Sequence, residues 1–270
     1  MGGAPSGTLN ASYEQEEAEP ERRPKTGLII GIIALIVLVL AASLGGGFLF
    51  LRPRTPVVQA TPTPTPLPSP TGKPLFSDTF ANNNNGWDLT SKAGQFSVKV
   101  GNGSMALEDD NNRLLWELIP NNQNFGDFYL TVDANLTKGS QANGYGIYIR
   151  GTSDQSLDFA TYYRFEVYGD GSYAIFKGTV NAAGVSNNQQ LVNYTPTTII
   201  NKAGKVNHIA ISAKGSTMTL YVNGQKLKTI IDDTYASGSV ALFVSNLPQS
   251  PAGAATTFSN LVIYPPQPWA

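Results

Sequence analysis

The patterning of apolar residues from Leu75 to Ala270 is the feature that most constrains how this chain can fold. Apolar runs there are short and alternate with polar residues at period two, as in half-buried strands. Turn strings such as "NNNNG", "GNGS", "YGDGS" and "VNGQ" interrupt them at intervals that suit antiparallel pairing. The pattern predicts strands at 95–100, 104–108, 113–118, 126–135, 144–150, 161–168, 172–177, 206–213, 217–222, 225–229, 239–244 and 257–264.

This many strands exceeds what a single sheet normally holds, so residues 75–270 are expected to form two stacked sheets. The predicted fold class is all-β, an antiparallel β-sandwich of jelly-roll type. Asn223 and Gly224 suit a two-residue hairpin turn, because both residue types tolerate positive φ. Charged residues make up only 14% of the chain, which is typical of many-stranded extracellular proteins.

Three segments of different character precede this domain. Residues 1–26 are polar and rich in glutamate, and they predict a disordered tail. Residues 27–51, "GLIIGIIALIVLVLAASLGGGFLFL", contain no charge and are long enough, at about 1.5 Å per residue, to cross a hydrocarbon core of about 30 Å. We interpret them as a transmembrane helix rather than a cleaved signal peptide, whose apolar region is shorter. Residues 52–74 alternate Thr or Ser with Pro, which favours an extended linker.

This layout predicts a single-pass protein of the plasma membrane with an extracytoplasmic C-terminal domain. An anchor followed by a stalk, without any cysteine, is typical of a bacterial surface protein. Small residues four apart in the span, such as Gly27 and Gly31, permit self-association of the helix, although glycine is also simply tolerated there. A net charge of −1 gives no reason to expect nucleic acid as a partner.

Several stretches resemble the concanavalin A-like lectin/glucanase superfamily. "LFSDTFANNNNGW" is similar to the opening of such domains, "TFSNLVIY" to their closing strand, and "NHIAISAKGSTMTLYVNGQKL" to their central strands. "NGYGIYIRG" with "YYRFEVYGDGSYAIFKG" resembles the laminin G-like and 3-keto-disaccharide hydrolase-like members. The resemblance implies one of the functions that this fold hosts, which are those of lectins, carbohydrate-binding modules, glycosidases and adhesion domains. Asn260 stands where an aspartate is common, which weakens the carry-over of a calcium site found in some relatives.

Catalytic motifs are scarce. Glycoside hydrolysis ordinarily needs two facing carboxyls, yet the strand acids have no second acid two residues away: Glu117, Asp127, Asp133 and Glu166. The only histidine, His208, lies in an alternating strand and is expected to be structural or at the surface. The chain therefore looks more like a binding protein than an enzyme, and Glu166 is the acid/base candidate if it is catalytic.

No metal or cofactor is expected. The string "EDDNN" at 108–112 offers oxygen ligands for Ca²⁺ but lacks EF-hand spacing. It is better explained as a hydrated turn, because oxygen-rich turns are common.

The strongest candidate site lies on the strand "TYYRFEVY". Alternation places Tyr163, Phe165 and Val167 in the core and the other side chains on the opposite face. The strand "YGIYIRG" is expected to add to that face, and "SYAIFKG" to present either Tyr173 with Lys177 or Phe176. The predicted ligand-binding residues are Tyr148, Arg150, Tyr162, Arg164, Glu166 and Tyr168.

Aromatic rings beside a guanidinium and a carboxylate can stack on a sugar and bind its hydroxyls. The alternative is a solvated face with cross-strand Arg–Glu pairs. Three functions remain open: a membrane-tethered carbohydrate-binding module, a sugar-processing enzyme of the 3-keto-disaccharide hydrolase type, and a structural or protein-interaction domain of the cell surface.

Overall fold

The computed structural model describes residues 67–154, 157–180, 186–246, 251 and 253–270. The predicted tail at 1–26, the predicted transmembrane helix at 27–51 and the predicted linker up to residue 66 lie outside these ranges. Within the described ranges, no helix is long and apolar enough to cross a membrane.

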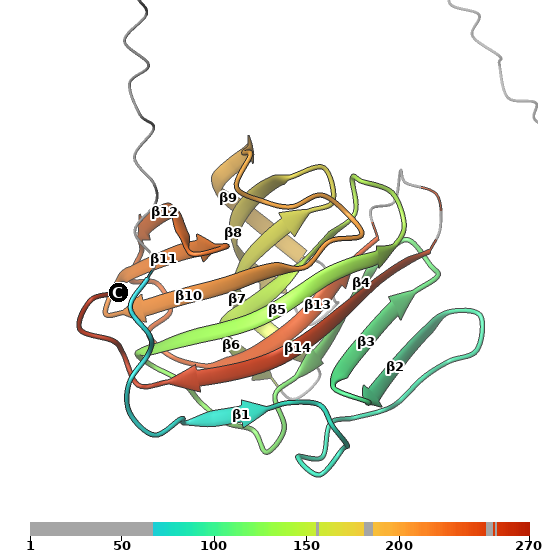
Figure 1. Cartoon of the computed structure of the whole chain (residues 1–270), viewed down its shortest axis with the longest axis horizontal. Helices are drawn as coiled ribbons and strands as arrows, with labels where there is room; N and C mark the ends of the chain where they lie inside the picture. Colours follow the sequence, from blue (N-terminus) through green and yellow to red (C-terminus); the bar gives the residue numbers. More distant parts are fainter. Residues whose placement is uncertain (1–66, 155–156, 181–185, 247–250, 252) are drawn as a thin grey trace, which may run out of the picture. The chain divides into compact units, whose positions relative to one another are not determined.

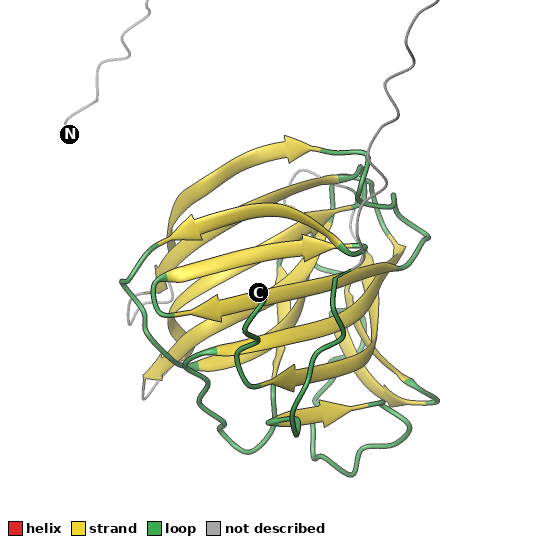
Figure 2. Ribbon diagram, turned by 60° about the vertical axis from the view of Figure 1, so that its left-hand side comes forward, coloured by secondary structure: helices red, strands yellow, loops and turns green. Residues whose placement is uncertain are grey.

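Two antiparallel sheets stack face to face, which confirms the predicted all-β sandwich (Figures 1 and 2). The larger sheet has the order β12-β11-β10-β5-β14-β3-β2, with β1 paired to β14. Its strands are β1 (Phe76–Asp78), β2 (Phe96–Gly101), β3 (Ser104–Asp109), β5 (Phe128–Lys138), β10 (Asn207–Lys214), β11 (Thr217–Val222), β12 (Gln225–Ile231) and β14 (Ala254–Tyr264). The smaller sheet has the order β4-β13-β6-β7-β8-β9. Its strands are β4 (Leu114–Leu118), β6 (Gly144–Asp154), β7 (Leu157–Tyr168), β8 (Ser172–Val180), β9 (Ser186–Pro196) and β13 (Ser239–Ser245).

Every strand range predicted from the alternation is occupied by a strand, and two strands were missed. β1 is too short to show a period. β9 has the sequence "SNNQQLVNYTP", whose mostly exposed amides hide the alternation because it is the edge strand of its sheet. The predicted hairpin turn is confirmed, since Asn223 and Gly224 both have positive φ, at 50° and 76°.

The hydrophobic core lies between the two sheets. β7 contributes Tyr163, Phe165 and Val167 to it, and β5 contributes Leu130 and Val132 from the opposite layer. All five side chains are at most 1% exposed. The inward faces therefore hold the sandwich together, and the outward faces are left for other roles.

The end of the predicted linker packs against the domain. Leu67 contacts an aromatic cluster on the outside of the eight-stranded sheet that includes Tyr129 and Trp269. The Thr71 N–H donates to Gln267 Oε1 at 2.9 Å, and Gln267 Nε2 donates back to the Thr71 carbonyl at 3.1 Å. Residues 67–71 are thus fixed on the side of the sandwich away from the six-stranded sheet.

Large side chains lie over glycines on the outer face of the six-stranded sheet, meaning the face directed away from the eight-stranded sheet. A Cβ at Gly144 would overlap the carboxylate of Glu166, and one at Gly178 would overlap the ring of Tyr162. Because each glycine lies on a neighbouring strand, the long side chains of β7 can lie flat along the sheet. This explains why Tyr162 and Glu166 are only 4% and 1% exposed although they point away from the core.

We predict that Gly144→Ala destabilises the fold by about 1–3 kcal/mol, because the added methyl group must displace the buried Glu166. Gly126→Ala is the matched control, since a Cβ there would have no heavy atom closer than 3.9 Å. The control is expected to change the free energy of unfolding, measured in urea, by at most about 1 kcal/mol. Equal stability of the two variants would contradict this packing argument.

A polar cluster ties β8 to the loop after β12. Asp232 accepts hydrogen bonds from Lys177 Nζ at 2.7 Å, from the Thr234 N–H at 2.9 Å and from the Tyr163 hydroxyl. Burial by itself would raise the pKa of Asp232, but the hydrogen bonds from Lys177, Thr234 and Tyr163 lower it well below its ordinary value. The charged carboxylate is therefore favoured in the folded state.

Asp232→Asn is expected to cost about 1–3 kcal/mol of stability at neutral pH, because it removes a carboxylate that three donors stabilise. Since the folded pKa is lowered, this contribution is complete above the unfolded value of about 3.9 and is lost as pH falls through the folded pKa. The difference in unfolding free energy between the native chain and the variant should therefore shrink below about pH 4. A difference that stays constant from neutral to acidic pH would refute this role of the charge.

Candidate functional site

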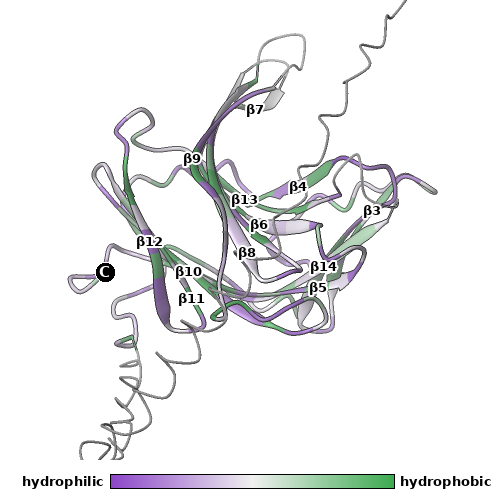
Figure 3. Cartoon of the chain, turned by 90° about the horizontal axis from the view of Figure 1, so that it is seen from above, coloured by the Kyte–Doolittle hydropathy of each residue, from purple (hydrophilic) through white to green (hydrophobic). Residues whose placement is uncertain are grey.

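The predicted face of β7 forms the centre of a continuous surface on the outer face of the six-stranded sheet. Tyr162, Arg164, Glu166 and Tyr168 alternate with the core residues of the strand, and pairing with β6 places Tyr148 beside Arg164. Figure 3 shows the six-stranded sheet stacked on the layer that contains β5, β10, β11 and β14. The Tyr148, Arg164 and Glu166 surface is on the side of the six-stranded sheet that faces away from this layer.

Arg164 and Glu166 form a buried ion pair on this surface, with Arg164 Nε 3.1 Å from Glu166 Oε2. The Arg164 side chain is 10% exposed and that of Glu166 is 1% exposed. The guanidinium also stacks on Phe176, with its central carbon 4.3 Å from the ring centroid. Arg164 is thus held flat between a carboxylate and an aromatic ring.

The hydrogen-bonding capacity of this pair is incompletely used. Among the described residues, no protein group makes a well-aligned hydrogen bond to Arg164 Nε, to either carboxylate oxygen of Glu166 or to the Tyr168 hydroxyl. The Arg164–Glu166 contact is therefore close in distance without being a well-aligned hydrogen bond. Buried polar atoms of this kind are uncommon in folded proteins, and a bound water or a ligand hydroxyl can satisfy them.

Burial and the mutual attraction of the two charges act in opposite directions on each member of the pair. Burial raises the pKa of the Glu166 carboxyl, while the charge of Arg164 and the nearby hydroxyls of Tyr168 and Ser245 act in the opposite direction. Burial alone would lower the pKa of Arg164, but the Glu166 carboxylate and Tyr148 raise it above its ordinary value. Arg164 therefore stays charged, and Glu166 is harder to ionise than an exposed glutamate.

Aromatic rings surround the pair on both sides. Tyr148 lies 4.8 Å from Tyr162 and 4.9 Å from Phe243, measured between ring centroids. On the other side, Tyr168 lies 5.0 Å from Tyr194 of β9. Tyr194 is the most exposed of these rings, at 54%. It is therefore the one most accessible to a ligand.

The structure corrects the placement of Arg150. A bulge in β6 interrupts the pairing with β7 between Ile149 and Thr152, and Arg150 has a positive φ of 51°. Its guanidinium is buried and donates to the carbonyls of Gly126 and Tyr235 at 3.2 Å each. Alternation fails at a bulge, so Arg150 ties loops together and does not join Tyr148 and Arg164.

β8 presents Phe176 to this surface. Tyr173 belongs to the core, and Lys177 binds Asp232, so the second of the two predicted arrangements occurs. Tyr194 and Trp116 also belong to this surface, although neither was predicted as a site residue. Alternation in the predicted strand 113–118 already puts Trp116 on the same face as Leu114 and Leu118, whereas Tyr194 lies in the unrecognised β9.

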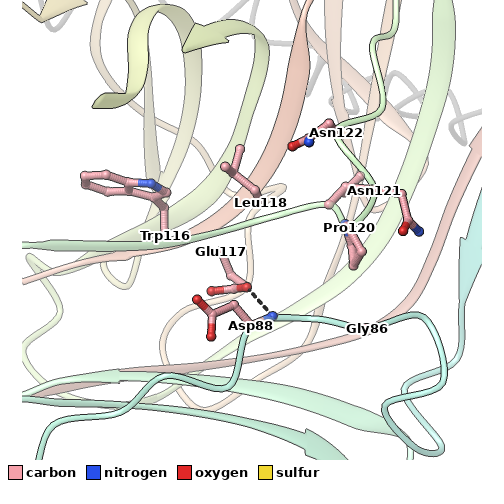
Figure 4. A pocket seen from close by; sticks show the side chains of 9 residues that line it. Gly86, Asp88, Trp116, Glu117, Leu118, Pro120, Asn121 and Asn122 are labelled. Atoms are coloured by element: carbon pink, nitrogen blue, oxygen red, sulfur yellow. Dashed lines mark hydrogen bonds between the residues drawn. The ribbon is translucent and has the colours of Figure 1, made fainter. Parts of the chain in front are cut away.

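A pocket of about 210 Å³ opens beside the edge strand β4 (Figure 4). Trp116 and Glu117 of β4 line it together with Asp88 and the amides of Asn121 and Asn122. Glu117 is 9% exposed, and its Oε1 accepts the Asp88 N–H at 2.9 Å. Glu117 pairs with the core residue Leu242 and Trp116 with Phe243, so the polar side chains of the pocket and the Trp116 ring lie on opposite sides of β4.

The other polar groups singled out in the sequence have structural partners. His208 lies on the eight-stranded sheet, where its Nδ1 is 2.7 Å from Asp133 Oδ1, and Asn260 Nδ2 donates to the other oxygen of Asp133 at 2.8 Å. In "EDDNN", Asp109 caps its own turn by accepting the N–H groups of Asn111 and Arg113. Within the ranges that the structure describes, no group of three or more His, Cys, Asp or Glu is arranged to hold a metal ion.

Comparison with solved structures shows that the sandwich is shared. It is similar to SCLam, a non-specific endo-beta-1,3(4)-glucanase from family GH16, at 12% identity over 75% of this chain and 95% of that chain, with a TM-score of 0.51. The kappa-carrageenase from Pseudoalteromonas carrageenovora matches at 10% identity over 70% and 92%, with a TM-score of 0.50. The carbohydrate binding module CBM66 from Bacillus subtilis matches at 17% identity over 67% and 96%, with a TM-score of 0.47. At such identities the likeness concerns the fold alone.

Comparison with curated proteins gives no match. Comparison with protein families does give one, to the family described as the 3-keto-alpha-glucoside-1,2-lyase-like domain. It extends over residues 72–262 and so takes in nearly all of the sandwich, including both strands of the Tyr148, Arg164 and Glu166 surface. The chain therefore belongs to the 3-keto-alpha-glucoside-1,2-lyase-like domain family.

Proposed function

We propose that this domain binds carbohydrate on the outer face of its six-stranded sheet. The observation that carries the proposal is the buried Arg164–Glu166 pair, whose polar atoms are incompletely hydrogen-bonded although aromatic rings enclose it. Sugars offer hydroxyls that both donate and accept hydrogen bonds, and they offer C–H faces that pack on aromatic rings. A sugar can therefore hydrogen-bond to the Arg164–Glu166 pair and pack on the aromatic rings around it.

Family membership supports a sugar ligand independently of the geometry, because the family is named for a glucoside lyase. The SCLam glucanase and the kappa-carrageenase, which share the fold, are named for polysaccharides that they act on. Glu166 is almost inaccessible, whereas Arg164 reaches the surface through its 10% exposed side chain. We therefore assign Arg164 to ligand contact and Glu166 to holding the guanidinium in place.

We further propose that residues 27–51 anchor the protein in a bacterial plasma membrane as a single span, with the domain outside the cell. The support is the charge-free apolar stretch followed by the Pro/Thr-rich segment. Leu67 and Thr71 dock on the outside of the eight-stranded sheet, so residues 67–71 do not cover the proposed binding face.

Catalysis is the second candidate, favoured by the family match. In a 1,2-elimination, a base removes the proton from C2 beside the C3 keto group. A C1–C2 double bond forms, and the C1–O bond breaks to release an alcohol that takes up a proton. Burial raises the pKa of Glu166, which suits a general base, but its 1% exposure requires the surrounding rings to move first.

The binding proposal predicts that Tyr194→Ala weakens saccharide binding about three- to tenfold, because it removes the most exposed ring of the surface. Calorimetric titration against a panel of saccharides measures this. Val206→Ala is the control, since Val206 is similarly exposed at 53% but precedes β10 of the other sheet. Equal loss in both variants, or no saccharide bound by the native chain, would contradict the proposal.

The catalytic candidate predicts turnover of 3-keto-glucosides by the native chain and a loss of at least about a hundredfold in Glu166→Gln. Release of the alcohol, followed chromatographically, measures turnover. Glu166→Gln keeps the shape of the side chain and removes its basicity, so circular dichroism should be unchanged. If the native chain binds these glucosides without converting them, the catalytic candidate is wrong and carbohydrate binding remains the proposed function.

A further inference from the structure

We propose that the outer face of the eight-stranded sheet is a docking surface for the chain's own Pro/Thr-rich segment. The occupant is residues 62–66, "PTPTP", which continue across β11 and β12 from the contacts that residues 67–71 already make. This face belongs to the sheet opposite the proposed carbohydrate-binding surface. The inference therefore goes beyond the proposed function and does not depend on it.

Tyrosines on the outer face of the eight-stranded sheet form an aromatic cluster. Tyr129 of β5 and Tyr221 of β11 alternate with the core residues Leu130 and Val222, so their rings point away from the core. The outer face of an antiparallel sheet is commonly solvated, yet Tyr129 is only 2% exposed and Tyr221 only 7%. Burial raises the pKa of Tyr129 to about 12. The rings are therefore covered by other parts of the chain.

Two proline-rich segments lie over this cluster. One is "LPSPT" at 67–71, and the other is "PPQPW" at 265–269, which follows β14. Leu67 and Trp269 both pack on the cluster, and the Trp269 ring centroid is 5.0 Å from that of Tyr129. In Figure 1 the chain between residue 67 and β1 crosses β5 and β10. Aromatic surfaces of this kind are what proline-rich segments bind in other proteins.

Gln267 holds the first of these segments in place. Its side chain belongs to a residue that is only 2% exposed, and its Oε1 accepts the Thr71 N–H at 2.9 Å. Its Nε2 donates to the Thr71 carbonyl at 3.1 Å and to the Pro265 carbonyl at 2.7 Å. A proline-rich segment has few N–H groups and no internal hydrogen bonds, so each remaining backbone N–H needs an outside partner. The buried amide of Gln267 supplies one.

The contacts show the direction in which the segment runs. The Leu75 N–H donates to the Ile263 carbonyl of β14 at 2.7 Å, Thr71 binds the tail after β14, and Leu67 reaches the cluster of β5, β10 and β11 side chains. Traced toward lower residue numbers, the chain thus crosses the sheet from β14 toward β11, and β12 is the next strand in order.

The length and sequence of the preceding residues suit the rest of this path. Proline stands at every second position from 62 to 70, so the pattern that favours an extended conformation does not change at Leu67. Five residues at about 3.1 Å each cover about 15 Å, which is enough to cross two strands about 4.8 Å apart. Docking of residues 62–66 leaves residues 52–61 as the part of the predicted linker that is free to act as a spacer.

The test is the motion of a nitroxide label in the full chain, solubilised in detergent. The sequence contains no cysteine, so Thr63→Cys gives a single labelling site. Ser69→Cys, an exposed position in the docked stretch, is the immobile reference. By electron paramagnetic resonance, the rotational correlation times of the two labels should agree within about threefold. Trp269→Ala should shorten that of the Thr63 label about five- to tenfold, because it removes part of the docking surface.

A control and a second measurement accompany this variant. Tyr194→Ala removes a ring that is 54% exposed on β9 of the other sheet, and it should leave the Thr63 label unchanged. If Trp269→Ala fails to fold, the distance between labels at Thr63→Cys and Lys226→Cys decides. Lys226 of β12 is exposed and pairs with Tyr221. We expect one narrow distance population below about 20 Å, since layers packed on a sheet lie about 10 Å from it.

Three results would overturn the proposal. A mobile label at Thr63 beside an immobile one at Ser69 means that docking ends at Leu67. A Thr63 label that becomes mobile when the chain is diluted means that a second copy supplies the surface. An unchanged label in a folded Trp269→Ala variant means that the aromatic cluster is not the docking surface. None of these results bears on carbohydrate binding, which the saccharide titrations test separately.

Discussion

The packing of two apolar sheet faces against each other is the interaction on which the rest of this domain depends. The sequence contains no cysteine, so no disulfide assists it. Side chains such as Phe165 from one layer and Leu130 from the other are fully or almost fully buried in a common core. Each large apolar side chain buried in this way stabilises the fold by about 1.5–3 kcal/mol. Because strand side chains alternate, this requirement directs Arg164 and Glu166 to the outer face.

The outer face is shaped by a second packing constraint, the pairing of large side chains on one strand with glycines on the next. Gly144 makes room for Glu166, and Gly178 makes room for Tyr162. The side chains of β7 therefore lie along the sheet and bury one another in place of projecting into solvent. The Arg164–Glu166 pair is therefore buried although it lies on the outer face of the sheet. This burial raises the pKa of Glu166, and neither carboxylate oxygen of Glu166 has a well-aligned hydrogen bond from the described residues.

Much of this arrangement was predictable. The alternation on β7 identified the face with Arg164 and Glu166, and the neighbouring strand correctly added Tyr148. The prediction failed at Arg150, because a bulge reverses the direction of the side chains that follow it. It also missed β9, since an amide-rich edge strand is not required to bury one face. The burial of the Arg164–Glu166 pair could not be predicted from the sequence. It depends on Gly144 of β6, which lies under Glu166 only because of the register between β6 and β7.

The sequence alone was enough to predict the fold class, the positions of the described strands except β1 and β9, and which side chains of β7 point away from the core. These follow from a period of two residues, which is a local property of the chain. Only the tertiary structure decided that Trp116, Phe243, Glu166 and Tyr194 share one line across a sheet. Strand order and register arise from long-range pairing, and a shift of a single residue would move any of these side chains to the other face.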